Sequence, residues 1–301
     1  MDYNLRMQIK LARGVYVVAV SGGVDSVVLL DLIHKLPNRQ LIVAHFDHGI
    51  RADSGSDRLF VAQLAEGKQL PYVYAEAKLG SGASEAKARL ARYAFLERVK
   101  RDHSADAIVT AHHQDDVLET AILNLSRGTG RRGLTALADT ATLRRPLLEF
   151  SKKEILSYAQ KNSLSWQEDV TNQDDRYLRN YIRHQISPRL SAEQRQQFLQ
   201  IISALRRINR ELDAELVQSL RAVSRNSELD RKAINSLPPD VRRELLATWW
   251  RGAGFNAYES KTFTRVLHDL KACHTGATIP LKSHFEMRIG KDTLALVKHE
   301  R

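Results

Sequence analysis

The chain has 301 residues, of which 43% are hydrophobic and 27% are charged, a balance typical of a globular protein of about two domains. The formal net charge of +11 is spread over both halves, so a polyanionic partner and a merely basic surface explain it equally well. The single cysteine, Cys273, excludes intramolecular disulfides, Cys-based zinc sites and CxxC redox pairs, and the lack of a long apolar run predicts a cytoplasmic protein with no membrane segment.

The first part of the chain alternates short apolar runs with stretches of helical periodicity. We expect strands at residues 15–20, 41–46, 71–75 and 107–111. Helices are expected at residues 27–36 and 84–100, around 117–125, and at 152–161, where Ser151 and Glu154 form a capping box. This alternation predicts an α/β fold in which helices cover both faces of a parallel sheet.

After Pro188 the pattern becomes mainly helical. Residues 191–221 contain no Gly or Pro and have helical periodicity, which Pro238-Pro239 interrupts and residues 241–250 resume. Residues 284–289 and 293–297 alternate as in a short β-hairpin. We therefore expect one domain over residues 1–188 and a second, mainly helical domain with a hairpin over residues 189–301.

A glycine-rich string, Ser21-Gly22-Gly23-Val24-Asp25-Ser26, lies between a predicted strand and a predicted helix. Paired glycines permit a sharp turn, and the backbone N–H groups at a helix N-terminus can bind an anion such as phosphate. The string is not a Walker A loop, because no Gly-Lys-Ser/Thr follows. Two glycines alone would rather indicate an ordinary capped turn, so the interpretation depends on the whole string.

The whole string resembles the SGGxDS signature of the N-type ATP pyrophosphatases, or PP-loop enzymes. Members of that superfamily cleave ATP between the α- and β-phosphates, adenylate an oxygen and release pyrophosphate. The resemblance implies a Rossmann-like domain in which the backbone from Gly22 to Ser26, with the hydroxyls of Ser21 and Ser26, holds phosphate. It also implies that Asp25 helps to place Mg²⁺.

Further segments resemble those of the bacterial tRNA(Ile)-lysidine synthetases. They are His45–Arg51, the helix that carries Arg89, Arg92 and Tyr93, His112–Thr120, Arg127–Leu134, Arg145–Leu148, Glu168–Asn172 and Tyr177–Arg183. The resemblance covers residues 15 to about 190 and is loose beyond them. It implies that ATP adenylates the C2 oxygen of the wobble cytidine (position 34) of a tRNA(Ile) with a CAU anticodon. Free L-lysine then displaces AMP to give lysidine.

The acidic residues Asp116 and Glu119 lie three positions apart on one predicted helix, just past the end of a strand. Two carboxylates on one helix face at that edge of a sheet suit a cationic amine, and the matching positions of the family lie in its lysine site. The alternative is that they are surface acids that complement the helix dipole, which is the interpretation we favour for Asp115.

The remaining site assignments also follow from the resemblance. Arg92 and Arg183 are expected at the α-phosphate, and His45 and His112 at the nucleotide. Arg127, Arg131, Arg132 and Arg179 are expected to contact the tRNA backbone, as is the second domain. The alternatives are solvated arginines and ordinary hydrogen-bonded histidines, and His113 is expected to be of the latter kind.

Two other functions compete with lysine ligation. A PP-loop enzyme that thiolates tRNA would need cysteines, and this chain has one. A non-catalytic nucleotide-binding or tRNA-binding module would not need an acidic pair beside a phosphate-binding turn. The sequence leaves the oligomeric state open, with a homodimer among the options.

Overall fold

The computed structural model describes residues 7–49, 54–77, 85–167, 178–255, 260–281 and 284–299. The chain divides into two compact units, Met1–Ala204 and Leu205–Arg301. The sequence places the boundary at 188/189, whereas this division falls inside the long helix α8 (Ala192–Val223). The predicted motif residues Ile50, Arg51, Ser84, Tyr177 and 168–172 lie outside the described residues.

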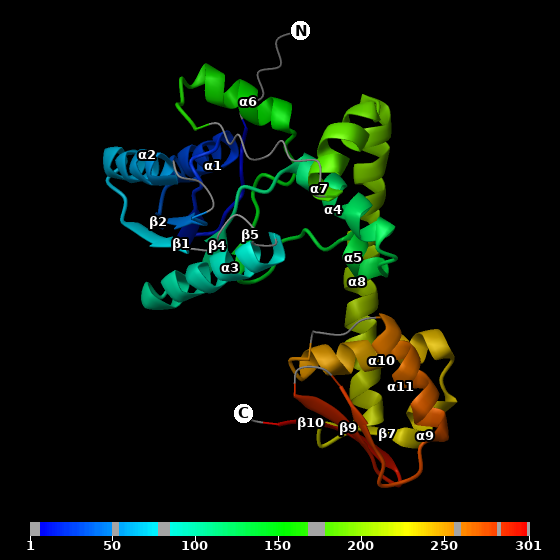
Figure 1. Cartoon of the computed structure of the whole chain (residues 1–301). Helices are drawn as coiled ribbons and strands as arrows, with labels where there is room; N and C mark the ends of the chain where they lie inside the picture. The colour runs from blue at the N-terminus through cyan, green and yellow to red at the C-terminus, as the bar shows by residue number, and fades with distance from the viewer. Residues whose placement is uncertain are drawn as a thin grey trace. The chain divides into compact units, whose positions relative to one another are not determined.

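The first unit has the predicted alternation of strands and helices. Its elements are β1 (Gly14–Ala19), α1 (Val24–His34), β2 (Arg39–Asp47), α2 (Ser54–Gly67), β3 (Tyr72–Glu76), α3 (Glu85–Asp102), β4 (Ala107–Val109), α4 (Gln114–Ser126), α5 (Arg131–Leu134), β5 (Leu143–Arg144), α6 (Lys152–Lys161) and α7 (Leu178–Tyr181), followed by the single turns Ile182–Ile186 and Ser187–Arg189. The strands form one parallel sheet in the order β3-β2-β1-β4-β5 (Figure 1). The α/β prediction is confirmed.

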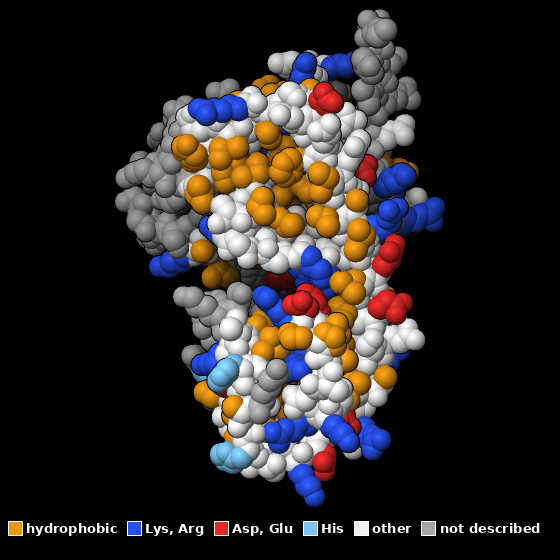
Figure 2. Space-filling view, turned by 90° about the vertical axis from the view of Figure 1, so that its right-hand side faces the viewer, with side chains coloured by type: hydrophobic (Ala, Val, Ile, Leu, Met, Phe, Trp, Pro, Cys, Tyr) orange, Lys and Arg blue, Asp and Glu red, His pale blue; other side chains and the backbone are white. Residues whose placement is uncertain are grey.

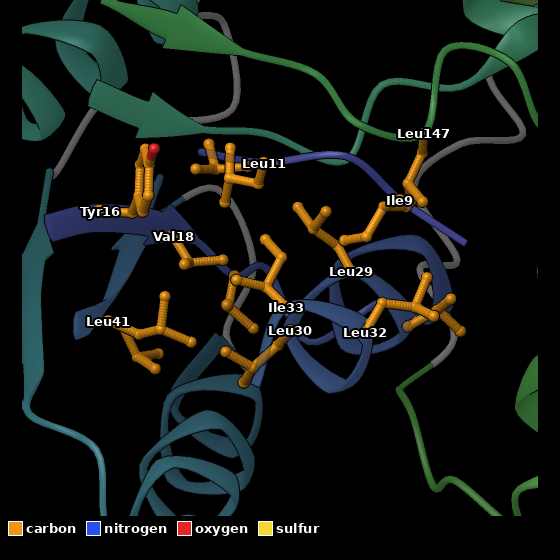
Figure 3. Close-up of a cluster of buried hydrophobic side chains, with 14 of the residues drawn as sticks. Ile9, Leu11, Tyr16, Val18, Leu29, Leu30, Leu32, Ile33, Leu41 and Leu147 are labelled. Carbon is orange, nitrogen blue, oxygen red and sulfur yellow. The ribbon is translucent and has the colours of Figure 1, made fainter. Parts of the chain in front are cut away.

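Helices cover both faces of this sheet, because alternate strand residues point to opposite sides. Tyr16 and Val18 of β1 pack in a cluster with side chains of α1, α2 and α6, whereas Val17 packs with side chains of α3. Figure 1 shows α1 and α2 on one side of the sheet and α3 on the other. Figure 3 shows Val18, Leu30 and Ile33 gathered between β1 and α1 in the larger cluster.

Leu30 offers a direct measure of this packing because its side chain is fully buried (0% exposed). We expect Leu30→Ala to lower the free energy of unfolding by about 2–5 kcal/mol, from lost apolar burial and the cavity left behind. Leu59→Ala on α2, where the leucine is 61% exposed, should change it by less than about 0.5 kcal/mol. Urea denaturation of the two variants would check this, and equal effects would contradict it.

The order of the strands creates a crevice beside β1. From β1 the chain runs to β2 and β3 on one side and then returns to β4 on the other side. The segments that follow β1 and β4 therefore leave the sheet in opposite directions. Open α/β sheets bind their ligands at the carboxyl ends of the strands at such a point. The glycine-rich turn follows β1 and His112 follows β4, so both lie at this edge.

The second unit combines helices with an antiparallel sheet. After α8 come β6 (Ser224–Arg225), β7 (Glu228–Asp230), α9 (Arg231–Ser236), α10 (Pro239–Gly252), α11 (Ser260–Ala272), β8 (Thr278–Pro280), β9 (Phe285–Ile289) and β10 (Thr293–Lys298). The predicted hairpin is confirmed as β9 and β10. It belongs to a larger sheet of order β6-β7-β10-β9-β8, which the sequence did not reveal because β6, β7 and β8 have only two or three residues each. Trp249 and Trp250 lie in the core of this unit.

Some large hydrophobic side chains of the first unit remain exposed. They include Leu125, Leu178, Tyr181 and Ile201, and Figure 2 shows hydrophobic side chains gathered in the upper half of its view. Along α4, Val117 and Ala121 are buried, but Leu125 is 56% exposed. The homodimer stays a prediction. In the described part of the chain, no helix has the length and apolar character needed to cross a membrane.

Candidate active site

A cavity of about 380 Å³ opens at the carboxyl ends of the first unit's strands. Eight of the predicted site residues line it: Ser21, Gly23, Asp25, Ser26, His45, Arg92, His112 and Asp116. Glu119, Arg179 and Arg183 are not among the lining residues but contact one another next to Asp116. Arg127, Arg131 and Arg132 are also not among the lining residues.

The glycine-rich turn is held in shape by its own side chains. The Ser26 hydroxyl accepts hydrogen bonds from the N–H groups of Ser21 (3.2 Å) and Gly22 (3.3 Å) and donates to the carbonyl of Gly23 (2.8 Å). Gly22 has a φ of +98°, a conformation that favours glycine. Gly23 is the N-cap of α1 and supplies no capping side chain, so an anion can occupy the cap position. Ser26, predicted to hold phosphate, shapes the turn in this structure.

Asp25, in the first turn of α1, is paired with a lysine that sequence reasoning missed. The Nζ atom of Lys152 lies 2.6 Å from Oδ1 and 2.8 Å from Oδ2 of Asp25. The Nε2 atom of His113 is 3.8 Å from the same carboxylate. Lys152 is the first residue of α6 and lies between Ser151 and Glu154 of the predicted capping box, which is confirmed. Nothing local in the sequence relates it to a residue 127 positions away.

The acid pair on α4 is neutralised by the two arginines of the segment after α6. The Arg183 guanidinium donates to both oxygens of Glu119, at 2.7 and 2.8 Å, and approaches Asp116 at 3.5 Å. Arg179 lies 3.3 Å from Asp116 and 3.4 Å from Glu119. Burial lowers the pKa of Arg183, but the hydrogen bond with Glu119 and the negative charges of Glu119, Asp116 and Asp25 together raise it more, so the net direction is upward.

This pairing has a simple physical reason. The exposed fractions of Asp116 and Glu119 are 8% and 2%, and two carboxylates so deeply buried remain charged only when cations compensate them. The structure therefore places Arg183 and Arg179 on the acid pair, whereas the sequence led us to expect them at the α-phosphate and at tRNA.

Asp116 also completes the N-terminus of α4. Its Oδ2 accepts from the N–H of His113 at 2.9 Å, while Nδ1 of His113 accepts from the N–H of Asp115, which fits the ordinary role expected for His113. Burial raises the pKa of Asp116, but His113, His112, this hydrogen bond and Arg179 together lower it, and the net direction is downward. Asp116 is therefore a carboxylate at neutral pH.

Asp115 was expected to be a simple surface acid, and the structure gives it two partners. Its Oδ1 lies 2.6 Å from Nη1 of Arg195 on α8, and its Oδ2 accepts from the N–H of Lys152 at 3.0 Å. Asp115 therefore ties α4 to the first turns of both α6 and α8.

His112 is a neutral group on the cavity wall. Its Nδ1 lies 2.8 Å from the hydroxyl of Thr110. Burial lowers the pKa of His112 to about 3, and the nearby Arg145, Arg92 and Arg89 act in the same direction while Asp116 opposes them. At neutral pH the imidazole can exchange hydrogen bonds with a ligand but brings no charge to it.

His45 presents an unused acceptor to the cavity. Its Nδ1 lies 2.9 Å from the carbonyl of Val20, so this nitrogen carries the proton. The Nε2 atom is then an acceptor, and it is buried without a hydrogen-bond partner among the residues that the structure describes. A buried acceptor is costly to leave unpaired, so we infer that a hydroxyl or amino group of a ligand donates to it.

Two of the arginines expected to contact the tRNA backbone lie on a short helix. Arg131 and Arg132 are half-buried on α5, and the Asn124 side chain donates to the carbonyl of Gly133 at 2.7 Å. Arg127 is exposed at the end of α4.

In the described residues there is no group of three His, Cys, Asp or Glu side chains that could hold a metal ion. Magnesium would fit here in its usual manner, on one carboxylate such as Asp25 together with substrate phosphates and water.

Comparison with known proteins finds relatives along most of the chain. The chain is 32% identical over 271 residues to a tRNA(Ile)-lysidine synthase of Exiguobacterium sibiricum, which covers 87% of this chain and 65% of the relative. It is 35% identical over 269 residues to a tRNA(Ile)-lysidine synthase of Methylococcus capsulatus, which covers 83% of this chain and 61% of the relative. The chain thus spans less than two thirds of the length of these relatives.

The fold also matches a solved structure, the U34-tRNA thiolase NcsA from Methanococcus maripaludis. The TM-score is 0.54 at 18% identity, covering 66% of this chain and 73% of that one, a likeness that concerns the fold alone. Residues 4–190 match the family model described as the PP-loop domain. These residues contain the whole parallel sheet and the cavity at its edge, and the chain belongs to the PP-loop domain family.

Proposed function

We propose that the protein uses ATP to ligate L-lysine to C2 of the wobble cytidine of a tRNA(Ile) with a CAU anticodon. The observation that carries the proposal is the meeting of a phosphate-type turn and a buried acid pair at one cavity, in a chain whose relatives are named tRNA(Ile)-lysidine synthase. The products would be lysidine, AMP and pyrophosphate.

In the first step the C2 oxygen of the cytidine attacks the α-phosphorus of ATP and pyrophosphate leaves. The turn Ser21–Ser26 binds the phosphates through the N-terminus of α1. Arg92, on the cavity wall, supplies positive charge for the α-phosphate. Magnesium, when bound through Asp25, would neutralise phosphate charge. The unpaired Nε2 of His45 accepts a hydrogen bond from the nucleoside.

In the second step the ε-amine of lysine attacks C2 and AMP leaves. Free lysine has a pKa of about 10.4 and arrives as an ammonium. Asp116 and Glu119 attract it, in exchange for part of their contact with Arg179 and Arg183. An arginine released in this way can move to the negative charge on the α-phosphate. Asp116, whose pKa is lowered, holds the cation, and Glu119 takes up the proton that the ammonium loses as the amine attacks C2.

An ATP–pyrophosphate exchange assay tests this function. We expect exchange that depends on the tRNA and not on lysine, and formation of labelled lysidine only when lysine is added. Exchange without any tRNA would indicate a small-molecule substrate. Sulfur transfer to the tRNA in place of lysine would indicate a thiolase, and binding without turnover would indicate a non-catalytic module.

We also propose that α5 and the second unit contact the tRNA backbone. Each phosphate neutralised by a protein cation lowers log K by about 0.7–0.9 per log unit of salt. Charge reversal at Arg131 and Arg132 should therefore make the salt dependence of tRNA binding less steep by about one to two units and leave ATP affinity unchanged. Filter binding across a salt series would measure it. Charge reversal at Lys100 and Arg101, at the end of α3, is the matched control. An equal effect on the salt dependence there would show that α5 is not a specific contact surface for the tRNA.

A further inference from the structure

Lys152 occupies the place beside Asp25 where a cation is needed. Its Nζ lies within 2.8 Å of both carboxylate oxygens, and its backbone N–H donates to Asp115. We propose that Lys152 is a further phosphate-binding residue, which compensates Asp25 while the site lacks a nucleotide and binds the departing pyrophosphate during adenylation. The proposal rests on the ATP chemistry inferred above.

The ion pair between Lys152 and Asp25 is exposed enough to break when another ion binds. The side chains of Lys152 and Asp25 are 39% and 28% exposed, whereas Glu119 in the neighbouring network is 2% exposed. An ion pair with this exposure contributes at most about 1 kcal/mol, because water competes for both partners. A divalent cation at Asp25 can therefore displace the ammonium.

The backbone of Lys152 stays close to the turn when its side chain moves. Helix α6 packs on the same core as α1 through Ile155 and Ala159, and the Tyr158 hydroxyl donates to Asp31 of α1 at 2.9 Å. The capping box of Ser151 and Glu154 fixes the first turn of α6. Only the flexible four-carbon stem of the lysine has to rotate for Nζ to leave the carboxylate and reach phosphate oxygens at the same turn.

The chemistry explains why a cation is needed at this point. A bond forms between the C2 oxygen of the cytidine and the α-phosphorus, and the bond from that phosphorus to the bridging oxygen breaks. The electron pair leaves with pyrophosphate, whose negative charge rises as it departs. An ammonium that donates hydrogen bonds to this group stabilises it more in the transition state than in bound ATP, which speeds the step.

The test compares Lys152→Gln with Lys153→Gln, which makes the same charge change at the next, exposed position of α6. Pyrophosphate binding is measured by calorimetry, and Mn²⁺ binding to the nucleotide-free protein by electron paramagnetic resonance. We expect Lys152→Gln to weaken pyrophosphate binding about 10- to 100-fold, as for loss of a charged hydrogen bond. Mn²⁺ should bind about two- to fivefold more tightly, because its competitor at Asp25 is gone. Lys153→Gln should change neither.

Lys152→Arg keeps the charge and should recover part of the pyrophosphate affinity. If Lys152→Gln binds pyrophosphate as well as Lys153→Gln does, Lys152 is not a phosphate ligand. If Mn²⁺ does not bind Lys152→Gln more tightly, a divalent cation does not compete with Lys152 for Asp25. Neither measurement uses tRNA or lysine, so both remain decisive even if the exchange assay assigns another substrate. Thermal unfolding of the variants separates these outcomes from misfolding.

Discussion

Glu119→Gln should leave pyrophosphate release close to normal and slow lysine transfer by about 10- to 100-fold. The substitution keeps the shape of the side chain but removes the charge that attracts the lysine ammonium, and a charged hydrogen bond contributes about 1.5–3 kcal/mol. Asp116→Asn should act in the same direction. Rapid-quench experiments with labelled ATP and labelled lysine would follow the two steps separately and show adenylated tRNA accumulating.

Burial makes a control for stability necessary. Glu119 is 2% exposed and binds Arg183 through both oxygens, so Glu119→Gln removes the closer of the two carboxylates that compensate this half-buried guanidinium. If this variant melts early, Glu119→Gln is combined with Arg183→Gln, which removes both charges of the pair. The rates of pyrophosphate release and lysine transfer are then compared in this double variant. Glu66→Gln, at an exposed position of α2, should behave as the unmodified protein. Equal loss of pyrophosphate release and lysine transfer would place Glu119 at the ATP side of the site.

Asp25→Ala should reduce adenylation by about 10²-fold or more while changing the melting temperature little. The expected loss is that of a preorganised electrostatic group at the point where phosphate charge develops. Stability should hold, since the pair of Asp25 and Lys152 is partly exposed and contributes at most about 1 kcal/mol. Pyrophosphate exchange and thermal unfolding measure the two effects.

Asp25→Asn is the informative companion, because it keeps the size of the side chain and removes only its charge. If the negative charge of Asp25 holds a cation, Asp25→Ala and Asp25→Asn should lose adenylation activity to the same extent. Near-normal exchange by Asp25→Ala in excess Mg²⁺ would show that Asp25 does not hold the metal, and early melting would show that its role is structural.

Local patterns predicted most of the first unit. The apolar runs gave the strands, and Ser151 with Glu154 gave the start of α6 to the residue. Helix α2 was missed, since its sequence opens with Ser-Gly-Ser, which is typical of a loop. The short strands β6 to β8 are held by their neighbours in the sheet and leave no periodic signal.

The site was predicted less completely than the fold, because its charged side chains pair with partners that are far away in the sequence. The turn, Arg92, His112 and Asp116 were expected together and do line one cavity. The partners of the acids were not foreseen: Lys152 lies 127 residues from Asp25, and Arg183 lies 64 residues from Glu119. Each of these sequence stretches is an ordinary helical segment by itself, and only the fold reveals which charge each one neutralises.

The first turns of α8 have a consequence for synthesis on the ribosome. Val117 and Leu118 of α4 pack against Phe198 and Ile202, and Asp115 binds Arg195, 80 residues further along the chain. At a translation rate of about 5–20 residues per second, α4 is made roughly 4–16 s before the residues that cover it. During this interval the nascent chain displays an apolar helix face beside the carboxylates of Asp116 and Glu119, and this is when we expect a chaperone to be most useful to it.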